Sequence, residues 1–157
     1  MKPQDFMNLI LADEPQIALA ISTGAAYEVW FQVELGILLR KANIQFAREL
    51  PYSAPYASWK LDTAVQDTDG IHAIEIKVES ATNAGRALAT ALHMDAVKVA
   101  NYTTTNGGNL TRWVVAIAYS GEAKTALQQI AANDPKKMSG YLEGAHKAIG
   151  ILLQVVQ

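Results

Sequence analysis

The chain has 157 residues, half of them hydrophobic, which is enough for one substantial core and too few for two independent ones. Its 13 basic and 15 acidic residues give a net charge of −2, which excludes a general attraction to polyanions. The absence of cysteine excludes disulfides and thiolate metal sites. We therefore expect a single domain over residues 1–157, in which any nucleic-acid contact comes from local clusters of charge.

The amino-terminal segment predicts helices. Residues 3–22 have the pattern of two short helices broken at Pro15, and a longer helix is expected from about Ala25 to Ala42. The early apolar run over residues 6–12 is well short of the roughly 20 residues that a membrane span needs, and it lacks the features of a signal peptide. We therefore expect a soluble, cytoplasmic protein.

Three strands are predicted next. Residues 44–50 alternate between apolar and polar side chains, and residues 59–66 and 71–78 have strand patterns as well. The sequence Asp67-Thr68-Asp69-Gly70 is typical of a tight turn, because glycine accepts a positive φ and aspartate stabilises the turn backbone. The second and third strands are therefore expected to form a hairpin.

The second half predicts a helix ending near Val99, capped by Ser80 or Thr82, and then a flexible loop over 103–109. Residues 113–119 are apolar at every position, as in a strand covered on both faces. Further helices are expected over 121–133 and 139–157. The order indicates an α/β (α+β) domain with a mixed sheet of about four strands, a core over about 25–119 and helical additions at 1–24 and 120–157.

The predicted hairpin carries charged residues that can converge. The two-residue period of a strand places Glu75 and Lys77 on one face, and counting outward from the turn places Asp62 opposite Glu75 to within one or two positions. Adjacent carboxylates repel unless a cation lies between them, and Mg²⁺ is commonly held by one or two carboxylates. The pattern therefore predicts a Mg²⁺ (or Mn²⁺) site with Lys77 beside it, the alternative being an ordinary solvated strand face.

The helix expected over 25–42 contains a carboxylate within its apolar side. At about 100° per residue, Glu34 projects from the middle of the apolar arc, whereas Glu28 falls at its border beside Gln32 and is expected to be solvated. Burying an unpaired carboxylate costs several kcal/mol, so Glu34 is expected to face a cation, metal-bound water or a hydrogen-bond network. A purely structural ion pair with Lys41 is the alternative. The arc comprises Tyr27, Trp30, Phe31, Val33, Leu35, Ile37 and Leu38.

This series of residues resembles the PD-(D/E)XK nuclease superfamily, whose fold is restriction endonuclease-like. The resemblance rests on Glu34, Asp62 and the triplet Glu75-Ile76-Lys77, followed by a helix and an all-apolar strand, and it covers about residues 25–119. Leu61 stands where the family name has proline.

The resemblance implies Asp62, Glu75 and the backbone carbonyl of Ile76 as metal ligands, Lys77 as the catalytic lysine and Glu34 as the acid borne by the helix. The implied activity is that of a Mg²⁺-dependent endonuclease, a hydrolase of phosphodiester bonds, with DNA as the expected partner.

DNA contact would need basic and aromatic groups near this site. Four basic side chains come from neighbouring elements: Lys60, Arg86, Lys98 and Arg112. Three aromatic side chains could stack on bases: Tyr52, Tyr56 and Trp59. Solvated charges and core aromatics are the alternative for each. The default partner of Lys98 is Asp95, three residues earlier on the same helix.

The alternative function is a non-catalytic binding or immunity-type protein that keeps a nuclease-like fold for protein contact. The near-neutral charge and the hydrophobic composition favour it. The expected C-terminal helix would supply the interface, or a homodimer contact, through an apolar stripe that otherwise packs on the protein's own core: Ile149, Leu152, Leu153 and Val156.

Overall fold

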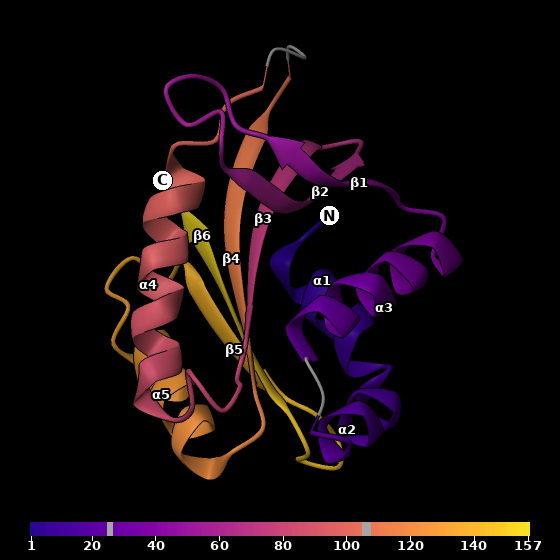
Figure 1. The fold of residues 1–157 in the computed structure, drawn as a ribbon, viewed down its shortest axis with the longest axis vertical. Helices are drawn as coiled ribbons and strands as arrows, with labels where there is room; N and C mark the ends of the chain where they lie inside the picture. The colour runs from indigo at the N-terminus through magenta and orange to yellow at the C-terminus, as the bar shows by residue number, and fades with distance from the viewer. Residues whose placement is uncertain (25–26, 105–107) are drawn as a thin grey trace.

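A six-stranded mixed sheet forms the middle layer of the computed structural model, which describes residues 1–24, 27–104 and 108–157. The strands are β1 (Gln45–Pro51), β2 (Lys60–Asp67), β3 (Gly70–Val78), β4 (Leu110–Ala118), β5 (Ser139–Glu143) and β6 (Gly150–Val156). The helices of the described residues are α1 (Pro3–Leu11), α2 (Glu14–Ser22), α3 (Tyr27–Lys41), α4 (Arg86–Ala100) and α5 (Gly121–Ala132). Helices α1 to α3 lie on one side of the sheet, and α4 and α5 lie on the other (Figure 1). The fold is α+β, as expected, with six strands where about four were predicted.

The sheet is antiparallel from β1 to β3, and β4 then pairs with β3 in parallel. The strand order is β1-β2-β3-β4-β6-β5. Residues 113–118 of β4 are all buried, because apolar side chains from the helices cover both of its faces. The prediction of a doubly covered strand is therefore confirmed for residues 113–118. Strand β3 lies next to it in the middle of the sheet.

The hairpin predicted between β2 and β3 is present. Asp67 Oδ1 accepts a hydrogen bond of 2.7 Å from the backbone N–H of Asp69, and Gly70 has a φ of 131°, so both residues do what the turn chemistry predicted. Thr63 pairs with Ile74 in the register. The paired segment ends there, and Asp62 and Glu75 are the next residues of the two strands.

Helix α3 rests on the sheet through Phe31, Leu35 and Leu39, which are buried at a spacing of four residues. Val33 and Ile37 belong to the predicted apolar arc, but they are 46% and 41% exposed. The arc was therefore centred wrongly, because two apolar stripes run along this helix and only one of them meets the core. The first two residues of the helix predicted over 25–42 lie outside the described residues, as do residues 105–107 of the predicted loop.

Helix α4 begins later than predicted. Ser80 donates from its hydroxyl to Asn83 Oδ1 at 2.8 Å within a turn, and the helix starts at Arg86 after Gly85, whose φ is 58°. Neither Ser80 nor Thr82 is therefore the cap. None of the helices in the described ranges has the length and apolar character needed to cross a membrane.

The predicted C-terminal helix over 139–157 is wrong, because this segment forms the hairpin of β5 and β6. Strand β6 lies between β4 and β5, and Ile151, Leu152 and Leu153 are fully buried. A strand covered on both faces is apolar at consecutive positions, and such a run also satisfies the spacing of a helix. The helical interface proposed for a homodimer or a protein partner therefore does not exist.

Glu14 ties helix α2 to the loop of this last hairpin. Its buried carboxylate accepts backbone N–H groups from His146 at 2.9 Å, Ala148 at 2.8 Å and Ile149 at 3.4 Å. Burial works against the charge, but the three amide donors outweigh it and lower the pKa of Glu14. The carboxylate thus replaces the strand partners that these loop amides lack.

Replacement of Glu14 by glutamine is expected to lower the free energy of unfolding by about 2 kcal/mol at neutral pH. Because the folded pKa of Glu14 is lowered, its contribution is complete above the ordinary carboxyl pKa of about 4.3 and is lost as the pH falls through the folded value. Urea unfolding of both proteins between about pH 3 and pH 7 should show the difference shrinking at the acidic end. Exposed Glu49, changed to glutamine, is the control. A constant difference across this range would contradict the prediction.

Candidate active site

Glu75 lies at the centre of a group of charged residues on the face of β3 that meets α4. It is 1% exposed, and its two oxygens accept hydrogen bonds from the Tyr52 hydroxyl at 2.7 Å and from Lys98 Nζ at 2.9 Å. Burial, followed by repulsion from Asp62, raises the pKa of Glu75 to about 8, although Lys98 and Tyr52 oppose the shift. Burial and the bond to Glu75 also raise the pKa of Tyr52.

Asp62 is fixed from two sides. Its Oδ1 accepts from Gln32 Nε2 on α3 at 3.1 Å, and its Oδ2 accepts from the backbone N–H of Ile76 at 2.8 Å. Gln32 Oε1 in turn accepts from Arg48 Nη2 on β1 at 3.1 Å. A chain of hydrogen bonds from α3 and β1 therefore holds this carboxylate beside Glu75.

Lys77 lies between the two helical layers at the end of β3. Its Nζ is 3.2 Å from both carboxylate oxygens of Glu28 on α3 and 3.6 Å from Asp95 Oδ2 on α4. Burial favours the neutral amine, but Asp95 and Glu28 outweigh it and raise the pKa of Lys77. Burial also raises the pKa of Asp95, and Lys77 opposes that shift. The lysine is therefore held as an ammonium ion with its direction set by two carboxylates.

The structure brings Asp62, Glu75 and Lys77 together, but it does not bring Glu34 to them. Glu34 is half-buried on α3, and within the described part of the chain it makes no hydrogen bond or ion pair with this group. Lys41, its alternative partner, is exposed. The prediction that Glu34 contributes to the charged site is therefore wrong. Helix α3 is oriented so that Glu28, and not Glu34, faces the end of β3.

Lys98 and Asp95 do not form the expected local pair. Lys98 contacts Glu75 and also donates to the backbone carbonyl of Lys60 at 2.8 Å, whereas Asp95 contacts Lys77. Asp95 and Lys98 of α4 are thus each paired with a residue of β3. Because Asp95 and Lys98 are only one turn apart, the helix can present both to the same strand.

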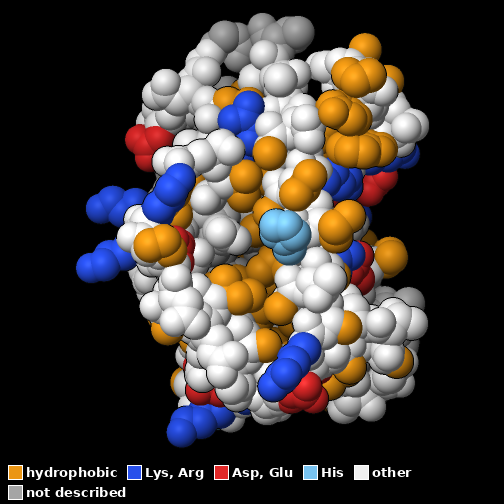
Figure 2. Space-filling model, turned by 90° about the vertical axis from the view of Figure 1, so that its left-hand side faces the viewer, with side chains coloured by type: hydrophobic (Ala, Val, Ile, Leu, Met, Phe, Trp, Pro, Cys, Tyr) orange, Lys and Arg blue, Asp and Glu red, His pale blue; other side chains and the backbone are white. Residues whose placement is uncertain are grey.

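The other basic candidates lie away from this group. Lys60 is exposed and pairs with Glu49 at 3.4 Å, Arg86 is exposed at the start of α4, and Arg112 donates to the Tyr102 carbonyl at 3.0 Å. Figure 2 shows the face that carries α4 and α5, with lysine and arginine side chains scattered over it. Of the four basic residues singled out in the sequence, Lys98 is the one that reaches the candidate site.

The aromatic candidates pack on one another. Tyr56 and Trp59 are stacked with ring centroids 4.4 Å apart, and Tyr52 meets the edges of Trp59 at 5.8 Å and of Tyr102 at 5.1 Å. Tyr52 is buried, so its role is the hydrogen bond to Glu75 and not stacking on a base. The cluster therefore holds Tyr52 in place as a donor to Glu75.

Four residues contact the site although the sequence did not predict that they would: Glu28, Gln32, Tyr52 and Asp95. Glu28 and Gln32 are four residues apart and share one side of α3, which is the signal that could have identified them. Whether the helix side with Glu28 or the side with Glu34 faces the site depends on which of the two apolar stripes of α3 is buried. Tyr52 carries no such signal, because the loop that positions it has no regular period.

His72 and the turn aspartates lie apart from the site. His72 is buried on the opposite face of β3, stacked on Trp113 at 4.4 Å, with Nε2 3.0 Å from Asp67 Oδ2. The two-residue period of the strand accounts for this position, because His72 has the opposite parity to Glu75 and Lys77.

The predicted metal ligands are all oxygen atoms. In the described ranges no three His, Asp or Glu side chains are arranged to hold a metal ion together. The predicted ligand set contains only two such side chains, Asp62 and Glu75, with the Ile76 carbonyl as a third donor. Burial and then repulsion from Asp62 raise the pKa of Glu75, and a cation bound by these oxygens would oppose that shift. Carboxylate and carbonyl oxygens are the type of ligand that Mg²⁺ takes in proteins.

Comparisons of the chain with models of protein families, with curated proteins and with solved structures gave no significant match.

Proposed function

We propose that this protein is a metal-dependent nuclease that hydrolyses phosphodiester bonds in DNA. The observation that carries the proposal is the convergence of two carboxylates, Asp62 and Glu75, with the Lys77 ammonium at one end of β2 and β3. Asp62 acts electrostatically on both Glu75 and Lys77, which supports treating the three as one site. Carboxylates that hold a cation, with an ammonium beside them, supply what phosphodiester hydrolysis requires.

The order of elements supports the same proposal. Helix α3, the antiparallel strands β1 to β3, helix α4 and the parallel strand β4 together resemble the core of the PD-(D/E)XK nucleases. In this comparison Glu28, and not Glu34, takes the place of the acid borne by the helix, because Glu28 contacts Lys77. Strands β5 and β6 extend the sheet beyond this core.

Each residue of the site has a role in this proposal. Asp62, Glu75 and the Ile76 carbonyl hold Mg²⁺ or Mn²⁺, which when bound polarises the phosphate and activates water. Lys77 stabilises negative charge that develops on the phosphate, and Glu28 and Asp95 hold its ammonium in place. Gln32 orients Asp62, and Tyr52 and Lys98 orient Glu75.

The proposal is tested by incubating the purified chain with supercoiled plasmid and with oligonucleotides. Cleavage is expected with Mg²⁺ or Mn²⁺ and is expected to stop when EDTA is added. An absence of cleavage with either metal would refute the proposal. Such a result would favour the non-catalytic alternative, although its predicted interface residues Ile149, Leu152 and Leu153 are buried.

Two glutamates on α3 provide a matched pair. Glu28→Gln is expected to lower the cleavage rate about tenfold to 100-fold, because Lys77 loses a charged partner 3.2 Å away. Glu34→Gln on the same helix is expected to leave the rate within about twofold. Initial rates of plasmid nicking, compared at equal folded fraction by circular dichroism, measure both. The reverse order of effects would restore Glu34 as the helix-borne acid.

A further inference from the structure

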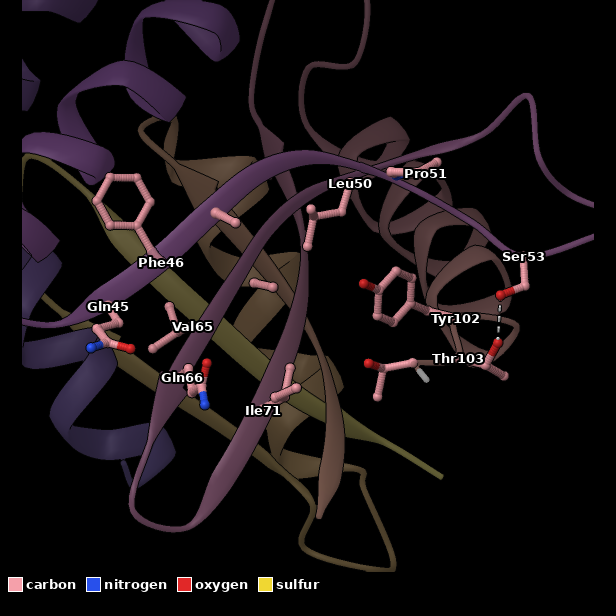
Figure 3. A pocket seen from close by; sticks show the side chains of 13 residues that line it. Gln45, Phe46, Leu50, Pro51, Ser53, Val65, Gln66, Ile71, Tyr102 and Thr103 are labelled. Atoms are coloured by element: carbon pink, nitrogen blue, oxygen red, sulfur yellow. Dashed lines mark hydrogen bonds between the residues drawn. The ribbon is translucent and has the colours of Figure 1, made fainter. Parts of the chain in front are cut away.

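A cavity of about 430 Å³ opens on the sheet beside the candidate site (Figure 3). Its floor includes Ala47 on β1 and Ala64 on β2, which face each other across the two strands. Their methyl groups leave a hollow that larger side chains would fill. Leu50, Ile71 and Tyr102 form apolar walls around it. The volume is within the range of about 300–1,000 Å³ of small-ligand sites.

The rim of this hollow is polar but uncharged. Gln45 and Gln66 face each other across β1 and β2 on one side, and both are exposed. On the other side Thr103 donates from its hydroxyl to the Ser53 hydroxyl oxygen at 3.0 Å. None of the described residues that line the cavity is charged, so a phosphate or carboxylate has no partner inside it. A flat, neutral, largely apolar group with hydrogen-bonding edges suits it better.

The hollow lies directly beside the proposed metal site. Ala64 is two residues from Asp62 along β2, a distance of about 7 Å in a strand. Ala64 packs in the apolar cluster on the α4 side of the sheet, the side on which Lys98 meets Glu75. Tyr102, which forms one wall, packs against Tyr52, and the Tyr52 hydroxyl bonds to Glu75. A group joined to a phosphate at Asp62 and Glu75 can therefore reach the hollow.

We propose that this hollow binds one unstacked nucleobase of the DNA strand whose phosphodiester is bound at Asp62 and Glu75. The position of the phosphate rests on the proposed function. The apolar walls receive the faces of the base, and the carboxamides of Gln45 and Gln66 meet its edge, as glutamine side chains do with base edges elsewhere. The neutral lining keeps the phosphates outside, at the charged end of the strands.

The test uses a DNA duplex that carries 2-aminopurine, a fluorescent adenine analogue whose emission rises when it leaves the base stack. Separate duplexes place the analogue at each position of one strand in turn, with Ca²⁺ in place of Mg²⁺. One position is expected to show increased emission on binding the wild-type protein. Ala47→Leu fills the hollow at an exposed position, and is expected to remove this increase and weaken binding about tenfold. Ala132→Leu, also exposed, on α5, is the matched control and should behave as wild type.

Cleavage of the same duplexes in Mg²⁺ is measured in parallel. Cleavage without an increase in emission at any position, or an increase that survives Ala47→Leu, overturns the base-binding inference and leaves the nuclease proposal standing. An increase that Ala47→Leu removes, without cleavage in Mg²⁺ or Mn²⁺, supports the hollow as a base site and refutes the nuclease proposal. An absence of both binding and cleavage overturns both.

Discussion

Replacement of Asp62 by asparagine is expected to lower the rate of Mg²⁺-dependent DNA cleavage by at least about 100-fold. Asparagine keeps the shape of the side chain and one oxygen that can accept from Gln32 or Ile76, so the local structure should persist. The negative charge is lost, however, and with it one of the two carboxylates that would hold the cation. The rate should therefore fall while the protein remains folded.

Initial rates of plasmid cleavage over a range of Mg²⁺ concentrations measure this effect, and thermal unfolding shows that the fold is retained. Asp69→Asn is the control, because Asp69 is exposed in the turn of the same hairpin. Removing Asp62 also removes the repulsion that helps to raise the pKa of Glu75. The variant is therefore expected to be as stable as the wild type or slightly more stable. Cleavage at the wild-type rate would show that the chemistry lies elsewhere.

Replacement of Glu79 by alanine is expected to lower the free energy of unfolding by about 3 kcal/mol or more. Glu79 is fully buried just after β3, and it accepts backbone N–H groups from Tyr119 and Ser120, both at 2.8 Å, and from Gly85 at 3.3 Å. The Ser120 hydroxyl also donates to it. These donors hold its pKa low against the effect of burial. Alanine would leave all of them without this acceptor.

Thermal unfolding measures the loss, which should appear as a decrease in Tm of about 10 °C. Glu122→Ala, an exposed glutamate in the first turn of α5, is the control and should change Tm by only a degree or two. Glu79 joins the ends of β3 and β4 to the starts of α4 and α5, so its loss should also loosen the support of Lys77. A Tm equal to that of the wild type would show that water replaces the carboxylate at no cost.

The hairpin and its charged residues could be predicted because their signals are local. The turn chemistry of residues 67–70 sets the hairpin, and the register then follows by counting back to the pair of Thr63 and Ile74, next to Asp62 and Glu75. The apolar run of β4 likewise predicts a strand covered on both faces. The same reasoning failed for β6, because a doubly covered strand and a buried helix share one apolar pattern.

The order of elements through β4, and the grouping of two carboxylates and a lysine on one hairpin, were determined by the sequence alone, because turns and side-chain periods act over a few residues. The tertiary structure decided which glutamate of α3 meets Lys77, since either of two apolar stripes could have been buried and only one fits the sheet. It also decided that Lys98 on α4 pairs with Glu75 on β3, although the two residues are 23 positions apart in the chain. Such pairings depend on how the helices pack on the sheet, and a local sequence pattern does not contain that information.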